Sequence, residues 1–173
     1  FNMVSKIKKF IKKIVRKDTL KQAVRDGLII GKNCEIDNSV FFGSEPYLIE
    51  IGDNVRLTKN VQFVTHDGGM WVLRNLGLAP KADKYGLIKI KNNVNIGWNV
   101  VIMPGVTIGN NVVIGVGSIV TKDVPNNTVY AGIPARFICT IEEYYEKNKD
   151  KIDFTKGYSP YDKKEYLIKK YFS

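Results

Sequence analysis

The chain has 173 residues, of which 25% are charged and 44% hydrophobic, and its formal net charge is +10 at neutral pH. This length is enough for one domain that folds without disulfides, and two cysteines are typical of a reducing compartment. No run of 18 apolar residues is present, which excludes a transmembrane helix, and no continuous apolar core indicates a secretory leader. We therefore expect a cytoplasmic protein.

The positive charge is concentrated at the N-terminus, where the first 25 residues carry nine basic side chains and one acidic one. Residues 4–17 alternate basic residues with apolar ones at helical spacing, namely Ile7, Phe10, Ile11, Ile14 and Val15. This pattern predicts an amphipathic helix within an N-terminal segment, residues 1–26. Its apolar stripe can cap the next domain or a neighbouring subunit, and the alternative is a helix lying on an anionic membrane surface at the inner face of the membrane. Nucleic-acid binding is disfavoured, because no aromatic-studded basic sheet accompanies the charge.

Residues 27–140 repeat with a period of six. Each of twelve units starts with an apolar residue: Ile30, Ile36, Phe42, Ile51, Leu57, Phe63, Ile90, Ile96, Ile102, Ile108, Ile114 and Val120. Neither a helix nor a single strand has this period, whereas short strand-and-turn units must stack to bury their apolar side chains. The pattern predicts an all-β solenoid, a parallel β-helix of about four coils.

Two kinds of position within the repeat carry further expectations. Glycine and asparagine suit tight corners, where a positive φ is needed, and we assign this role to Gly97, Gly109, Asn110 and Gly115. Cys34 occupies an inward position, so we expect a buried small hydrophobe rather than a nucleophile.

The repeat is interrupted by residues 69–86, an insertion far longer than a corner needs. It carries Trp71 and Arg74, and it is too apolar for a disordered linker, so we expect it to cover a site. Directly before it stands His66, the only histidine in the chain. A histidine on a rigid strand end is well placed to act as a general base. Asp67 follows it, but neighbours on a strand point apart, so we expect no direct pair between the two. A single histidine also argues against a zinc site built from several imidazoles.

After Thr140 the repeat stops, and residues 141–173 have the composition of a helical tail. The pattern predicts two short helices, one over residues 142–151 and one that starts near Ser159, with Pro160 in its first turn. We expect the many tyrosines of this tail to pack against the solenoid or a partner chain.

The segment IGWNVVIMPGVTIGNNVVIGVGSIVTKDVPNNTVYAGIPAR, residues 96–136, resembles the hexapeptide-repeat acetyltransferases. The resemblance extends over residues 27–140. It is to the sugar O-acetyltransferases of the maltose, galactoside and nodulation-factor type and to the capsular polysaccharide O-acetyltransferases. It implies a left-handed β-helix, a homotrimer with active sites between adjacent prisms, and acetyl-CoA as the acetyl donor.

The resemblance also implies which residues bind acetyl-CoA. Trp98 would contact the thioester, and Gly115 and Val116 would line the pantetheine arm. The adenine and phosphates would be held by Thr121, Lys122 and Arg136. Two cations suit the phosphate end, because CoA is a polyanion. Trp98 departs from the small residue common in the sugar enzymes, so the local shape of the thioester site differs here.

The implied reaction is direct acetyl transfer in a ternary complex without a metal. His66 would remove the proton of an acceptor hydroxyl, and backbone donors would stabilise the oxyanion. The expected acceptor is a cell-surface or capsular saccharide or its precursor, with Asp67, Trp71 and Arg74 as candidate contacts. One alternative is a xenobiotic acetyltransferase of the streptogramin or chloramphenicol type, disfavoured by Arg136, where an asparagine is usual. Another is a non-catalytic membrane-surface scaffold, which would not need His66.

Overall fold

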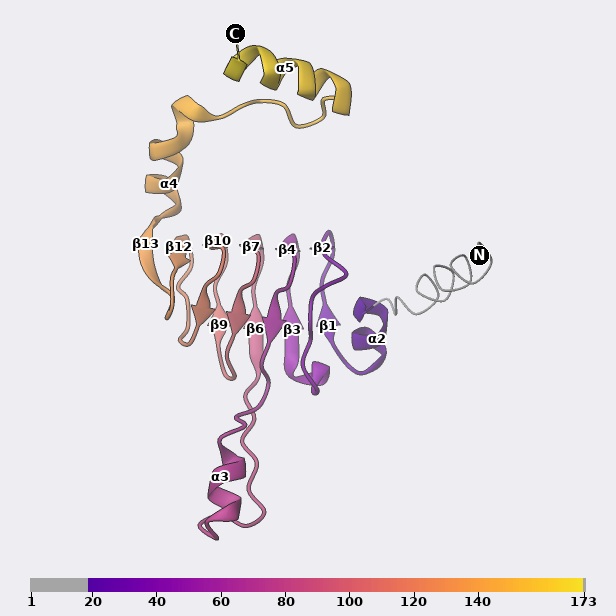
Figure 1. Ribbon diagram of the computed structural model, residues 1–173, viewed down its shortest axis with the longest axis vertical. Coiled ribbons are helices and arrows are strands. Elements are labelled where there is room, and N and C mark those ends of the chain that lie inside the picture. Colours follow the sequence, from indigo (N-terminus) through magenta and orange to yellow (C-terminus); the bar gives the residue numbers. More distant parts are fainter. Residues whose placement is uncertain (1–18, 173) are drawn as a thin grey trace, which may run out of the picture.

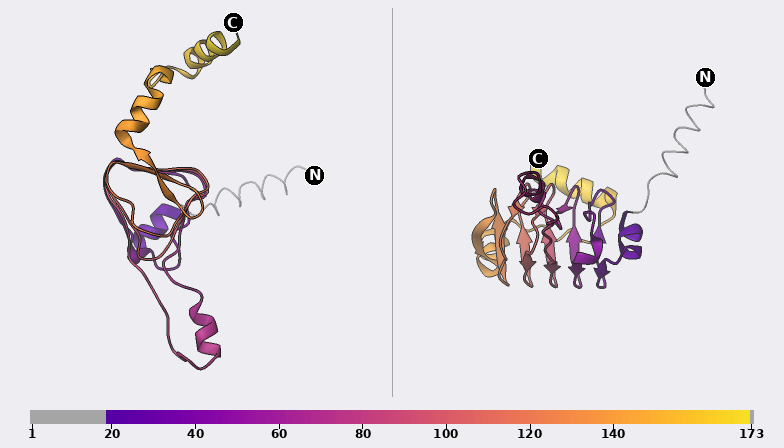
Figure 2. Two further views of the ribbon diagram at one scale, coloured as in Figure 1. Left: turned by 90° about the vertical axis from the view of Figure 1, so that its left-hand side faces the viewer. Right: turned by 90° about the horizontal axis from the view of Figure 1, so that it is seen from below.

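The computed structural model describes residues 19–172, so the predicted helix over residues 4–17 lies outside the described part of the chain. Short strands wind into a three-sided prism, from which an arm and a C-terminal tail project (Figures 1 and 2). No helix within residues 19–172 is long and apolar enough to span a membrane.

Each side of the prism is a sheet whose strands are stacked in parallel, apart from the last strand of the second sheet. The first sheet has the order β1 (Ile29–Ile30), β3 (Ile49–Ile51), β6 (Ile88–Ile90) and β9 (Thr107–Ile108). The second contains β2 (Glu35–Ile36), β4 (Val55–Leu57), β7 (Val94–Ile96), β10 (Val112–Ile114), β12 (Thr128–Ala131) and the antiparallel β13 (Arg136–Thr140). The third contains β5 (Gln62–Phe63), β8 (Val101–Ile102) and β11 (Ile119–Val120). The three sheets contain different numbers of strands, so the coil number of about four stays a prediction.

The six-residue period places the core. From Phe42 onward every unit-start residue is buried, with an exposed fraction of at most 4%, whereas Ile30 and Ile36 of the first coil are half-buried. The small or β-branched residues at the fifth position are buried beside them, from Val40 to Val124. Cys34 is half-buried, with its Sγ 3.2 Å from the carbonyl oxygen of Gly52. The interior is therefore a column of aliphatic layers.

The corners of the prism do not have positive φ angles at the residues that the sequence predicted. A positive φ occurs at seven asparagines, between 55° and 60°: Asn33, Asn54, Asn60, Asn93, Asn99, Asn111 and Asn127. Gly97, Gly109, Asn110 and Gly115 are not among the positive-φ residues, so that assignment was wrong. These glycines are needed for close approach instead: a Cβ on Gly97 would lie 2.7 Å from the nitrogen of Val116 in the next coil. Stacking distance, rather than backbone handedness, selects glycine there.

Regular stacking is interrupted twice, both times where the chain passes from the third sheet to the first. Val94 pairs with Val112, 18 residues on, but Ile30 pairs with Ile51, 21 residues on, so three extra residues enter before β3, in a segment that includes η1 (Pro46–Leu48). The second interruption is an arm, residues 67–87, which carries α3 (Met70–Asn75) and points away from the prism (Figure 1). The two interruptions follow one another in successive coils, so they lie at the same edge.

Helices lie beyond both ends of the prism. Helix α2 (Thr19–Arg25) covers the end at β1 and buries Ala23, while α4 (Ile141–Asn148) follows β13 with a capping box between Thr140 and Glu143 (Figure 1). A short η2 (Lys149–Lys151) and a connecting segment lead to α5 (Pro160–Phe172). At its start the Ser159 hydroxyl accepts the N–H of Asp162 at 3.1 Å.

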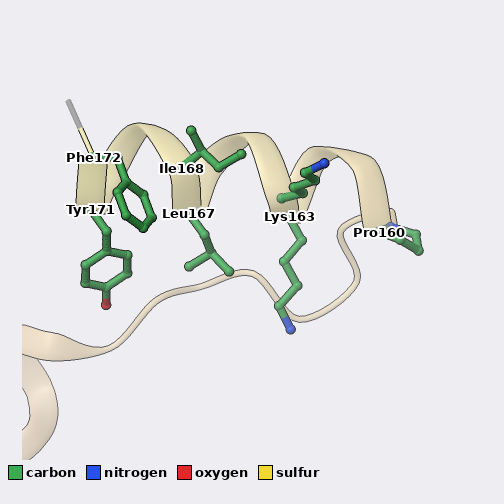
Figure 3. Close-up of a pocket in the computed structure, with 7 residues that line it drawn as sticks. Pro160, Lys163, Leu167, Ile168, Tyr171 and Phe172 are labelled. Atoms are coloured by element: carbon green, nitrogen blue, oxygen red, sulfur yellow. The ribbon is translucent and has the colours of Figure 1, made fainter.

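Helix α4 contacts β12 and β13, but the rest of the tail, with α5, lies away from the prism (Figures 1 and 2). The tyrosines of the tail are largely exposed, for example Tyr161 at 70% and Tyr171 at 63%, so the expectation that they pack on the chain's own solenoid was wrong. The reason is that α5 binds its own connecting segment, where Asp153 accepts hydrogen bonds from Tyr166 and Lys170, each at 2.6 Å. Leu167 and Tyr171 face a shallow open hollow (Figure 3). Packing on a partner chain stays a prediction.

Candidate active site

His66 is held at the base of the arm by a short antiparallel ladder. It forms a β-bridge with Tyr85, flanked by hydrogen bonds from the N–H of Asp67 to the carbonyl of Lys84 at 2.8 Å and from the N–H of Gly86 to that of Thr65 at 3.0 Å. The rings of His66 and Tyr85 meet edge to face, with centroids 6.3 Å apart. The His66 side chain is 45% exposed. The backbone therefore fixes the position of an accessible imidazole.

A carboxylate from the first interruption lies against this imidazole. The Oε2 atom of Glu45 is 3.0 Å from the Nδ1 atom of His66, and the same Oε2 accepts a hydrogen bond from the Thr65 hydroxyl. The hydrogen bonds from Thr65 and then from His66 hold the pKa of Glu45 below its usual value, against the opposing effect of burial. Glu45 was not among the residues predicted from the sequence. The available signal was the spacing of nine rather than six residues between the unit starts Phe42 and Ile51.

A hollow opens beside the pair, between the prism and the arm. Its volume is about 340 Å³, and it is lined by Glu45, His66, Asp67, Gly68, Trp71, Arg74, Asp83, Lys84 and Tyr85. The structure thus brings together four residues that the sequence singled out: His66, Asp67, Trp71 and Arg74. Its polar and aromatic lining suits a hydroxylated ligand better than an apolar one.

Several polar residues of the arm form hydrogen bonds and ion pairs with one another. Asp67 accepts the N–H of Gly69 at 2.9 Å and lies 3.3 Å from the ammonium of Lys84, which together hold its pKa below the usual value. It does not contact His66. Arg74 donates to Asp83 and to the carbonyl of Ala82, both at 2.6 Å. Trp71 remains 62% exposed, so its ring can meet a ligand.

Three of the residues assigned to acetyl-CoA meet at the opposite edge of the third sheet, where the chain enters it from the second. The carbonyl of Trp98 accepts the N–H of Gly117 at 2.8 Å, which stacks Trp98 beside Gly115 and Val116 of the next coil. Trp98 is 52% exposed and Val116 is 70% exposed. The ammonium of Lys59, one coil earlier, lies 5.5 Å from the Trp98 ring centroid, at a polar hollow of about 400 Å³.

The three remaining assigned residues are also exposed but do not form one group. Thr121 and Lys122 follow β11, so they lie at the edge of the third sheet that carries His66. Arg136 begins β13, opposite Ala131, and donates to the carbonyl of Ala135 at 3.0 Å. The third sheet therefore separates His66 from Trp98 within one chain.

Among residues 19–172, no group of three or more histidine, cysteine, aspartate or glutamate side chains is close enough to hold a metal ion.

Known proteins share this repeat and this prism. The family described as the hexapeptide repeat of succinyl-transferase matches residues 88–122. Protein CapG of Staphylococcus aureus is 46% identical over 169 residues, which cover 95% of this chain and 96% of CapG. A solved maltose O-acetyltransferase from Clostridium difficile 630 superimposes with a TM-score of 0.56 and 31% identity, covering 81% of this chain and 89% of that one. A solved galactoside acetyltransferase in complex with coenzyme A gives a TM-score of 0.54 and 36% identity, over 76% of this chain and 71% of that one.

The chain belongs to the hexapeptide-repeat acetyltransferase family, as the resemblance implied. Its three parallel sheets form the left-handed β-helix of that family. The protein is accordingly an acetyl-CoA-dependent O-acetyltransferase.

Proposed function

We propose that the protein transfers an acetyl group from acetyl-CoA to a hydroxyl group of a saccharide, with His66 as the general base. The observation that carries this proposal is the placement of the chain's only histidine in a polar hollow, on a rigid backbone and next to a carboxylate. A saccharide acceptor is supported by the similarity to a maltose and a galactoside acetyltransferase. We further propose a cell-surface or capsular saccharide, or its precursor, as the physiological acceptor.

In this proposal His66 removes the proton of the acceptor hydroxyl as that oxygen attacks the thioester carbonyl carbon. The thioester is already activated, so the enzyme has to position the two substrates, accept one proton and stabilise the oxyanion. Trp71 offers an exposed ring on which a sugar can stack, and Asp67 offers carboxylate oxygens to sugar hydroxyls. Arg74 would act mainly as a support, because Asp83 and Ala82 already accept its hydrogen bonds.

The donor would bind along the edge formed by Trp98, Gly115 and Val116. Among residues 19–172 the backbone N–H of Trp98 has no hydrogen-bond acceptor, so this group is available to donate to a thioester oxygen. Thr121, Lys122 and Arg136 would hold the nucleotide end, and a coenzyme with several phosphates needs such cations.

Because the third sheet separates His66 from Trp98, we propose that one active site uses the His66 edge of one copy and the Trp98 edge of another. A closed homotrimer places these two edges against each other three times, and it also covers exposed apolar side chains of the arm such as Leu76 and Leu78. The complete site would then exist only in the assembly.

The function is tested with radiolabelled acetyl-CoA and a panel of acceptors: maltose, galactosides, acidic capsular oligosaccharides and chloramphenicol. We expect label on a saccharide and free CoA in equal amount. Hydrolysis of acetyl-CoA without labelled saccharide contradicts the acceptor class, and preferential labelling of chloramphenicol supports the xenobiotic alternative instead. Wild-type protein without an acceptor is the matched control.

A further inference from the structure

The geometry points to Glu45 as the positioning residue of the active site: it holds the Nδ1 proton of His66 and so leaves Nε2 as the basic atom. This inference rests on the proposed role of His66. It concerns a residue of the short first interruption, far from His66 in sequence and in contact with it in space.

The hydrogen-bond partner decides the imidazole tautomer. A neutral imidazole has one N–H and one lone pair, and an ionised carboxylate can only accept. With Glu45 Oε2 at 3.0 Å from Nδ1, the favoured neutral form of His66 carries its proton on Nδ1 and donates it to Glu45. The lone pair is then on Nε2, the nitrogen that Glu45 does not contact.

Glu45 is itself held in place from behind. The Thr65 side chain is 1% exposed, and its hydroxyl donates to the same Oε2 that His66 contacts. A buried hydroxyl that donates to a carboxylate favours the ionised form, which agrees with the lowered pKa of Glu45. The Glu45 side chain is only 14% exposed, so water competes little for this oxygen.

The space for Thr65 is set by Gly43, which lies in the same interruption. Gly43 has φ +70°, and a Cβ there would lie 2.9 Å from the Thr65 hydroxyl and 3.0 Å from the carbonyl oxygen of Phe63. A larger residue would push Thr65 off its line to Glu45. Gly43, Thr65, Glu45 and His66 therefore form a continuous chain of contacts from the prism to the imidazole.

Glu45 also stabilises the charge that His66 gains during the reaction. When Nε2 takes the acceptor proton, the new oxygen–carbon bond forms, the carbon–sulfur bond breaks, and His66 becomes a cation beside an anion at 3.0 Å. The carboxylate stabilises that cation, and the imidazole then returns the proton from Nε2 to the departing CoA thiolate. Glu45 stays ionised throughout and exchanges no proton with substrate.

The single histidine makes the tautomer directly measurable. Uniformly ¹⁵N-labelled full-length protein has one pair of imidazole nitrogen signals, and two-bond ¹H–¹⁵N spectra at alkaline pH distinguish a protonated Nδ1 from a protonated Nε2. We expect protonated Nδ1 in the wild type. Glu45→Gln should shift the population toward protonated Nε2, and Thr65→Val should do so to a smaller extent. Glu50→Gln makes the same chemical change in the first sheet, where Glu50 pairs with Lys89 of the neighbouring strand, and it should leave the signals unchanged.

Kinetics give a second readout. We expect Glu45→Gln to lower kcat about tenfold to a hundredfold, as loss of an orienting partner does elsewhere, with little change in the KM for acetyl-CoA. Protonated Nε2 in the wild type overturns the inference, as does a Glu45→Gln spectrum identical to wild type. If the wild type shows the expected tautomer but transfers no acetyl group, the proposed function fails while the role of Glu45 in fixing the imidazole stands.

Discussion

The two edges of the third sheet are built in opposite ways. The Trp98 edge is regular: Trp98, Val116 and their neighbours take equivalent positions in successive coils, linked by ladder hydrogen bonds. The His66 edge is irregular, because two insertions leave the prism there and bring Glu45 and the arm to His66. A repeat can offer a long groove for an extended ligand, but a unique polar arrangement for chemistry requires a break in the repeat.

The largest expected effect comes from removing His66, the proposed general base. His66→Ala should lower kcat about 10²- to 10⁴-fold, while acetyl-CoA still binds, because the residues proposed for the donor lie elsewhere. Steady-state kinetics and calorimetric titration of acetyl-CoA measure the two effects. If His66→Ala turns over the true acceptor as fast as the wild type, the proposed general-base mechanism is wrong, although the assignment of the fold still holds.

The second test joins the two edges across copies. His66→Ala and Val116→Glu should each be nearly inactive alone, the first at the base and the second because a charge blocks the donor groove. Unfolded together and refolded, they should regain about a quarter of wild-type activity, since random assembly gives that share of sites one intact edge from each partner. Light scattering should report a trimer throughout. A mixture as inactive as its components would place the whole site in one chain.

A smaller effect is expected at the nucleotide end. Lys122→Ala should raise the KM for acetyl-CoA about tenfold with little change in kcat, because the contact is made equally in the ground and transition states. Lys91→Ala removes an exposed cation after β6 and serves as the control. Equal kinetic constants for the two variants would show that Lys122 does not bind acetyl-CoA.

The smallest effect on catalysis should come from deleting residues 4–17, since both edges lie within the prism. Acetyl-CoA affinity should equal that of the full chain. Sedimentation with anionic vesicles at low salt then decides the role of this basic segment: binding that the deletion removes supports a membrane surface, and no binding by the full chain supports an end cap.

Much of the fold was predictable because stacking coils demand it. The unit-start residues had to be apolar for every coil to bury its interior, so the six-residue period placed the core from Phe42 onward. The role of Gly97 was not predictable, because the distance to the next coil is a property of the stack and not of the corner. The isolation of α5 was equally hidden, since its bonds to Asp153 depend on how the connecting segment turns.

The site was half predictable. His66 stood out as the only histidine beside a long insertion. Glu45 did not, because its insertion adds only three residues and contact with His66 depends on the two breaks lying in successive coils. Nor does local sequence show that the third sheet keeps His66 apart from Trp98, which follows from the path of the chain around the prism.

Both insertions leave the prism at the same edge, and this affects which changes of sequence length the solenoid tolerates. After the arm, β7 and β10 keep the 18-residue spacing, and β4 still pairs with β7 in register across 39 residues. Length added at this edge thus leaves the hydrophobic layers undisturbed. In the proposed function the arm contacts the acceptor, so its length and sequence, and with them the acceptor preference, can change independently of the stability of the solenoid.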